Sequence, residues 1–138
     1  MHFMPELYRS AYEFIEYYPE QSLLRHVVTR EGQHMSWEDA RHDMLQLANI
    51  VRQTKPEKIL VDAVHFNMPV FKEMQEWLNA NLIVAFNEVH LKKWAIIVPT
   101  QFLAQVSIEQ TMAANPMNTF EAQYFEDEVE ARLWLNIN

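Results

Sequence analysis

Glycine is nearly absent from this chain of 138 residues, with Gly32 as its single example. At the usual frequency of about 7%, a chain of this length carries roughly ten glycines. Loops that hold phosphate groups need several glycines, because the backbone amides must approach the ligand closely. The composition therefore excludes a P-loop and a glycine-rich dinucleotide-binding fingerprint.

Cysteine is missing altogether. Its absence excludes disulfides, thiol catalysis and thiolate metal sites, and it agrees with a reducing compartment. Residues 1–10 include Pro5, Glu6 and Arg9 and contain no apolar run, which does not fit a signal peptide. The longest apolar stretches, such as residues 82–86, are too short to cross a bilayer. We expect a cytoplasmic protein that does not insert into membranes.

Basic residues are scarce as well. The chain has 11 Lys and Arg against 19 Asp and Glu, a net charge of −8 with His neutral. The densest basic groups are only two pairs, Lys92 with Lys93 and Lys55 with Lys58. Because nucleic acid binding needs a clustered basic surface, we expect no nucleic-acid partner. The negative net charge suits a solvated surface, and it is also compatible with a protein partner that has a basic surface.

What the chain does have is apolar side chains. Hydrophobic residues make up 49% of the sequence and aromatic residues 12%, which is enough for a real core and too many for a disordered chain. The length suits one domain. We predict a single domain over residues 11–138, preceded by an N-terminal arm over residues 1–10.

The sequence of the first half of the domain predicts a hairpin followed by a helix. Residues 12–18 and 23–29 are rich in aromatic and β-branched residues, and residues 19–22 are a plausible turn between them. Ser36 then begins a pattern that resembles a capping box, with Asp39 at its last position. Apolar residues recur at steps of three and four up to Val51, and Pro56 ends the predicted helix.

The second half alternates strands and helices. Residues 59–61 and 94–98 are continuous apolar runs typical of buried parallel strands. We predict a helix that begins at Asn67-Met68-Pro69 and fades near Phe86, and another that begins at Thr100 and reaches past Met112 to a break at 115–116. Residues 120–125 predict a last strand, and residues 127–135 a final capped helix. The order ββαβαβαβα predicts an α/β fold with a mostly parallel sheet of four or five strands and an antiparallel hairpin strand at its edge.

Four segments of this pattern resemble the STAS (SpoIIAA-like) superfamily, which is related to the Sec14-type lipid-binding fold: residues 55–62, 92–99, 120–125 and 127–135. The last of these resembles the closing strand and helix of small bacterial STAS-like proteins. The resemblance implies a non-enzymatic regulatory or protein-interaction module. Relatives that antagonise anti-sigma factors carry a phosphorylated serine or threonine just after the strand that ends in aspartate. Here Asp62 is followed by Ala63, Val64 and His65, so the phospho-acceptor is missing and the nearest downstream hydroxyl is Thr100. The Sec14-type relation leaves a second possibility, a small carrier of an apolar ligand or lipid.

Three residues after the strand that ends in Asp62 are candidates for ligand or partner binding. Asp62 and His65 are expected at the carboxyl end of that strand, where α/β sheets favour ligands, and Asn67 lies at the predicted helix start. A carboxylate can orient an imidazole for acid–base chemistry, yet no nucleophile lies nearby, so the alternative is a solvated loop. We assign no catalytic residue and expect no cofactor.

Two further interpretations of the sequence concern a metal site and apolar surfaces. Glu88 and His90, together with His65, contain ligand types that suit a metal, but no established motif spacing joins them, and we expect no metal site. The eight Met, eight Phe and four Trp residues can fill a core, line a pocket for an apolar ligand or cover a homodimer interface. The sequence leaves these three alternatives open.

Overall fold

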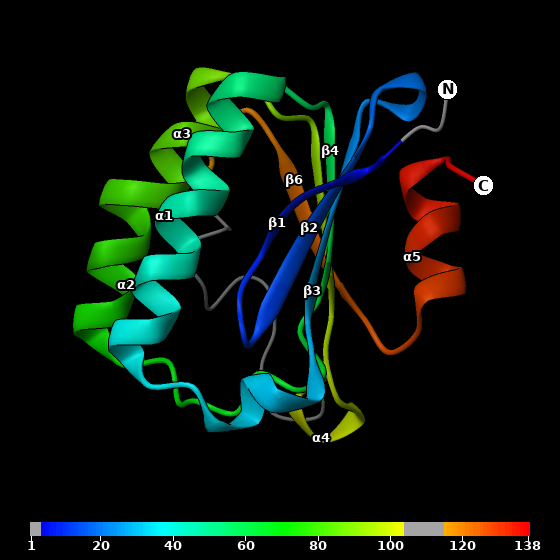
Figure 1. The fold of residues 1–138 in the computed structure, drawn as a ribbon. Helices are drawn as coiled ribbons and strands as arrows, with labels where there is room; N and C mark the ends of the chain where they lie inside the picture. Colours follow the sequence, from blue (N-terminus) through cyan, green and yellow to red (C-terminus); the bar gives the residue numbers. More distant parts are fainter. Residues whose placement is uncertain (1–3, 104–114) are drawn as a thin grey trace.

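A single six-stranded mixed sheet forms the centre of the molecule, confirming the α/β class (Figure 1). The computed structural model describes residues 4–103 and 115–138. The strands lie side by side in the order in which the chain makes them: β1 Glu6–Arg9, β2 Glu13–Tyr18, β3 Leu23–Val28, β4 Lys58–Asp62, β5 Lys93–Ile97 and β6 Glu121–Phe125. β1, β2 and β3 pair antiparallel, and β3 to β6 pair parallel.

Helices cover both faces of this sheet unequally. On one face lie α1 (Trp37–Thr54), α2 (Lys72–Leu78) and α3 (Val84–Glu88), while α5 (Glu128–Leu135) is the one helix of residues 4–103 and 115–138 that covers the other (Figure 1). A π-helical segment, η3 (Asn79–Ile83), joins α2 to α3 without a break in helical backbone. Shorter pieces complete the set: the 3₁₀ turns η1 (Pro19–Gln21) and η2 (Arg30–His34), and α4 (Thr100–Leu103).

The sequential strand order decides where the helices lie. Each new parallel strand is added beside the last in one direction, and right-handed crossovers then place the intervening helices on the same face. Such a sheet has no position where the strand order reverses, so it lacks the crevice at which doubly wound sheets bind ligands. A ligand site must instead lie between the sheet and the helices that cover it, or over α5.

Alternation along the strands divides the core into two layers. Ile15, Leu24 and Ile59 point toward the helix-covered face, where they pack with Val51 of α1 and Phe86 of α3. The residues next to them in the chain point the other way. That second layer consists of Leu23, Leu60, Ala95, Ile97 and Phe125 from the sheet with Ala131 and Leu135 from α5.

The sheet departs from the prediction at its N-terminal edge. Residues 6–9, assigned to an arm, form β1 and pair with β2, so the sheet has six strands and the prediction of four or five was wrong. The four residues of β1 are mostly exposed, so they lack the apolar alternation that marks a strand in a sequence. The predicted strand–helix order from residue 12 to residue 103 is otherwise confirmed, as are the last strand and helix.

The helix predicted from Asn67-Met68-Pro69 begins later, at Lys72 with Phe71 as its N-cap. Residues 63–71 instead cross the carboxyl edge of the sheet as a loop, in which Phe66 and Met68 pack against Val28 and Met35. Tertiary packing of these side chains therefore overrides the helix-start signal of Pro69. Of the helix predicted from Thr100, residues 100–103 are helical and the remainder lies outside the described residues.

Gly32 is required for space rather than for backbone freedom. It lies buried in η2, and no described glycine has a positive φ. A Cβ at this position would lie 2.3 Å from Cγ1 of Val28 and 3.3 Å from Cε of Met35. The turn between β3 and α1 is therefore packed directly onto the end of β3.

We predict that Gly32→Ala lowers the free energy of unfolding by about 1–3 kcal/mol, the usual cost of an added core carbon. Val28→Ala removes the nearest clashing atom, so Gly32→Ala should cost less in a Val28→Ala background. Urea unfolding of the two single variants and the double variant measures this coupling. Strict additivity of the two substitutions would contradict a direct contact.

Candidate functional site

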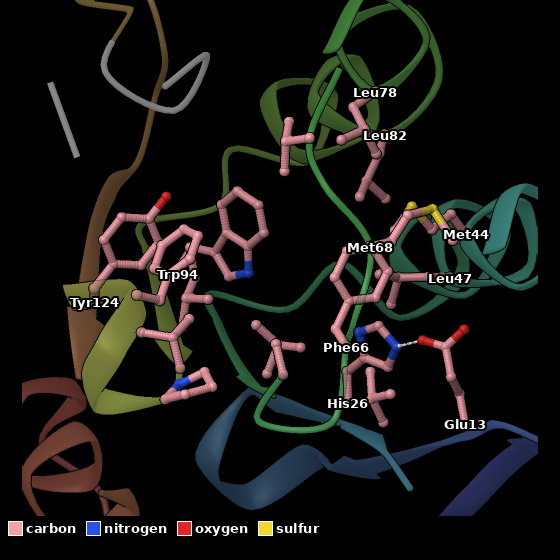
Figure 2. Close-up of a pocket in the computed structure, with 18 residues that line it drawn as sticks. Glu13, His26, Met44, Leu47, Phe66, Met68, Leu78, Leu82, Trp94 and Tyr124 are labelled. Atoms are coloured by element: carbon pink, nitrogen blue, oxygen red, sulfur yellow. Dashed lines mark hydrogen bonds and ion pairs between the residues drawn. The ribbon is translucent and has the colours of Figure 1, made fainter. Parts of the chain in front are cut away.

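A cavity of about 220 Å³ lies between the helix-covered face of the sheet and the loop over residues 63–70 (Figure 2). Its wall is formed by side chains from every layer on this side of the molecule. The lining residues are Glu13, His26, Val28, Met44, Leu47, Val61, Ala63, Phe66, Met68, Val70, Leu78, Leu82, Trp94, Ile96, Val98, Pro99, Phe102 and Tyr124. Apart from Glu13 and His26, these side chains are apolar or aromatic.

Strand alternation explains why the floor is apolar. Residues two apart along a strand face the same side. The floor includes Val61 of β4 with Ala63 just after that strand, and Trp94 with Ile96 of β5. The register places Ile15, His26, Val61, Ile96 and Tyr124 in one row across five neighbouring strands. His26 is thus the one side chain of this row that is neither apolar nor a phenol.

Trp94 is held rigidly in the wall of the cavity. Its ring makes edge contacts with Phe86 and Phe120, at centroid distances of 5.1 and 6.1 Å. Phe102 and Tyr124 form a similar pair at 5.3 Å. Such contacts fix ring orientation, so this side of the cavity keeps its shape without a ligand.

Glu13 and His26 form the polar corner of the cavity. Only 2% of Glu13 and 6% of His26 is exposed, and Nε2 of His26 is hydrogen-bonded to Oε1 of Glu13 (Figure 2). Burial opposes ionisation of Glu13, but the charge and hydrogen bond of His26 outweigh it and lower the pKa of the Glu13 carboxyl. The pair is therefore best described as a buried carboxylate held by an imidazole.

Asp43 of α1 extends this polar corner away from the cavity. Its Oδ1 accepts a hydrogen bond from the Tyr8 hydroxyl at 2.6 Å, and its Oδ2 accepts one from the Ser10 hydroxyl at 2.9 Å. Burial, together with the neighbouring Glu13 carboxylate, raises the pKa of Asp43 to about 6. Burial and the hydrogen bond to Asp43 likewise raise the pKa of Tyr8 to about 12.

One oxygen of this cluster has no hydrogen bond to the described residues, Oε2 of Glu13. A buried carboxylate oxygen without a donor is costly. The neighbouring Asp43 becomes protonated near pH 6, and its proton then provides a donor next to Glu13. The two carboxyls thus share one negative charge more readily than they carry two.

The second ring nitrogen of His26, Nδ1, is turned away from Glu13 and toward the side chains of the cavity (Figure 2). No described residue forms a hydrogen bond with it. Because Glu13 holds Nε2, the orientation of the ring is fixed and Nδ1 is presented to whatever occupies the cavity. A carboxylate that orients an imidazole in this way is a common device in binding and proton-transfer sites.

The residues proposed from the sequence lie beside this cavity but not in its wall. Asp62 follows Val61 and so points to the opposite face of the sheet, where its Oδ1 accepts a hydrogen bond from the Val64 amide at 3.2 Å. His65 and Asn67 are exposed in the loop. The loop residues between them, Phe66 and Met68, are the ones that face inward. A binding role for Asp62, His65 and Asn67 stays a prediction.

The three candidate metal ligands do not converge. His65 follows the carboxyl end of β4, whereas Glu88 and His90 precede the amino end of the neighbouring parallel strand β5, so about 16 Å of strand separates them. Glu88 instead pairs with Arg52 at 2.8 Å. Among the described residues, no group of three His, Asp or Glu side chains is placed to hold a metal ion.

Thr100 carries the nearest hydroxyl after Asp62 in the chain. Its hydroxyl donates a hydrogen bond to Glu126 at 3.0 Å.

Comparison with known proteins adds no relative: no family model matches the chain, and neither a curated protein nor a solved structure is similar to it. The described helices include none with the length and apolar character needed to span a membrane.

Glu13, His26 and Asp43 were missed by the sequence interpretation, although the sequence holds a signal for them. Glu13 shares the inward phase of β2 with Ile15, and His26 shares that of β3 with Leu24 and Val28. Ionisable residues on the apolar phase of two adjacent strands require each other as partners. Recognising the signal requires the correct pairing of those strands, which only the structure supplies.

We predict that Asp43→Asn reduces the pH dependence of stability between about pH 4 and pH 7. Folding raises the pKa of Asp43 from 3.8 to about 6, so its stabilisation is complete below about pH 4 and is lost as the pH rises through 6. The variant should be at least as stable as the wild type at pH 8. Urea unfolding across this pH range measures the difference.

Glu88→Gln is the matched control, because Arg52 lowers the pKa of Glu88 and the sign is reversed. Its carboxylate stabilises the fold only above the ordinary pKa of a glutamate. An Asp43→Asn variant with the wild-type pH profile would contradict the assignment.

Proposed function

We propose that this domain binds a small, largely apolar molecule in the cavity beneath the loop over residues 63–70. The observation that carries the proposal is the combination of an apolar wall with one oriented polar corner at His26. Ligand pockets typically combine predominantly apolar walls with a few placed polar groups that fix orientation. The cavity lies at one of the two places that the sequential strand order leaves for a site, between the sheet and the elements that cover it.

The volume limits the size of the ligand. An apolar cavity of about 150 Å³ in another protein holds benzene, and pockets for drug-sized ligands are about 300–1,000 Å³. At about 220 Å³, the cavity suits a substituted single ring or a compact aliphatic molecule. A two-chain lipid is too large, which narrows the carrier suggested by the Sec14-type relation to a compact ligand.

We further propose that binding is regulatory rather than catalytic, as the STAS-like resemblance implies. The described lining contains no Ser, Thr, Cys or Lys side chain, so the usual nucleophiles are not positioned against a ligand. The loop over residues 63–71 roofs the cavity and carries exposed side chains such as Val64 and Phe71. A ligand that packs beneath this loop can alter the surface that the loop presents to a protein partner.

We predict that Ala63→Leu weakens binding of ethylbenzene at least about tenfold, because the larger side chain occupies the cavity. NMR titration of amide shifts in the wild type should give a dissociation constant in the millimolar range or tighter. Ala80→Leu is the matched control, since Ala80 is exposed and lies outside the cavity wall. Equal binding by both variants, or no shift in the wild type, would overturn the proposal.

A protein-docking surface on α5 is a second candidate function. Val129 and Leu133 lie one turn apart and are 70% and 74% exposed, so both protrude from the same side of the helix. The opposite side of α5 is fixed to the sheet, because Ala131 and Leu135 are buried in the core layer on that face, and Arg25 of β3 pairs with Glu128 at the flank of the helix at 3.4 Å. A rigid helix with an apolar outer stripe suits association with a second copy of this chain.

We predict that Val129→Gln combined with Leu133→Gln weakens self-association and leaves the free energy of unfolding within about 0.5 kcal/mol of wild type, as expected for exposed sites. Sedimentation equilibrium at chain concentrations of about 5 to 500 μM measures the self-association. This range covers the micromolar dissociation constants typical of weak dimers. A wild type that is monomeric throughout would contradict a homodimer.

A further inference from the structure

The cavity wall offers two polar nitrogens that the described residues leave without partners. Nδ1 of His26 is one. The indole nitrogen of Trp94 is the other, since no described residue accepts its hydrogen, and Figure 2 shows the indole on the far side of the space from His26, with its nitrogen turned inward. An indole N–H is only a donor, whereas an imidazole nitrogen donates or accepts according to its protonation. The Trp94 nitrogen therefore requires an acceptor on the ligand, whereas the His26 nitrogen binds a donor or an acceptor.

The two nitrogens are separated across the floor of the cavity. Trp94 is on β5 and His26 on β3, with β4 between them, which places their strands about 10 Å apart. The register pairs Val61 with both His26 and Ile96, so Trp94 lies two residues further toward the start of β5. A molecule that meets both nitrogens must carry polar groups at its two ends and an apolar body between them.

Charge excludes an ionised ligand. Glu13 already places a carboxylate at the polar corner, and no Lys or Arg is among the described lining residues. An anionic ligand would be buried beside the Glu13 carboxylate, and both negative groups would depend on the His26 imidazole as their one polar partner. Buried charge without compensation is strongly disfavoured. Glu13 is the single acidic side chain among the described lining residues, and one of its two oxygens is already bonded to His26, so a cation would find one free carboxylate oxygen and otherwise apolar or aromatic surroundings.

From this geometry we infer that the cavity selects an uncharged, single-ring aromatic molecule with a hydroxyl group bound to Nδ1 of His26 and a second oxygen that accepts from the indole of Trp94. A hydroxyl both donates and accepts, so it satisfies His26 in either protonation state. The aromatic body packs against Phe66, Leu82 and Ile96. The inference rests on the proposed function and assigns the ligand class for the same cavity.

Four matched probes test this assignment: ethylbenzene, 4-ethylphenol, 4-(2-hydroxyethyl)phenol and 4-ethylbenzoate. The expected affinity order places the diol first, 4-ethylphenol next and ethylbenzene below it, with roughly three- to tenfold for each hydrogen bond formed. The benzoate should bind more weakly than ethylbenzene. Isothermal calorimetry or NMR titration of the wild-type chain gives the constants.

Two further measurements identify the contacts. ¹⁵N NMR of the imidazole should show a shift of the His26 Nδ1 resonance with 4-ethylphenol and none with ethylbenzene, which requires no substitution. Trp94→Phe keeps an aromatic ring but removes the N–H donor together with part of the indole ring. The lost ring atoms affect 4-ethylphenol and the diol alike, so the comparison of these two probes isolates the donor, and the variant should abolish the advantage of the diol. Trp134→Phe, on the other face of the sheet beside Phe125, is the control and should preserve that advantage.

The outcomes separate the two proposals. Equal affinity for ethylbenzene and the hydroxylated probes overturns the ligand class and leaves the apolar cavity as a binding site. Tightest binding by 4-ethylbenzoate overturns the charge argument in the same way. Failure of all four probes to bind overturns both the ligand class and the proposed function.

Discussion

The contact between Glu13 and His26 is the constraint on which the helix-covered side of this molecule depends. Both side chains lie on the inward phase of their strands, where water does not reach them. A buried carboxylate is tolerated only with partners, so β2 and β3 must pair in the register that brings the two together. Asp43 and Tyr8 then add α1 and β1 to the same network, which explains how a short, exposed edge strand is held in place.

The same contact also shapes the cavity. If His26 were apolar, its row across the sheet would be continuous from Ile15 to Tyr124 and could be covered by a helix packed closely on it. Instead, the chain crosses this region as the loop over residues 63–71, and α2 begins only at Lys72. The helices pack more closely on the sheet away from this edge, where Phe86 and Val51 cover Ile59 and Leu24.

The sequence predicts most of the architecture, because its strongest signals coincide with local physics. The strands predicted at residues 59–61 and 94–98 are observed as β4 (Lys58–Asp62) and β5 (Lys93–Ile97), and Ser36 with Asp39 forms the predicted capping box. The failures share one cause, dependence on tertiary contacts. β1 has no apolar pattern of its own, and Pro69 indicates a helix start that the packing of Phe66 and Met68 prevents. Glu13, His26 and Asp43 are far apart in the chain and acquire meaning only once β2, β3 and α1 are in contact.

The apolar wall of the cavity carries an energetic cost when no ligand covers it. An enclosed, empty apolar cavity costs about 24 cal/mol per Å³, so about 220 Å³ sets an upper limit of about 5 kcal/mol, and the opening of this cavity to solvent lowers the cost. Domains of this size have only about 5–15 kcal/mol of net stability. A compact ligand would recover part of that energy through contacts with rings that are already fixed, such as Trp94 between Phe86 and Phe120. Binding would therefore stabilise the loop over residues 63–71 together with the core beneath it, which couples occupancy of the cavity to the shape of the surface above it.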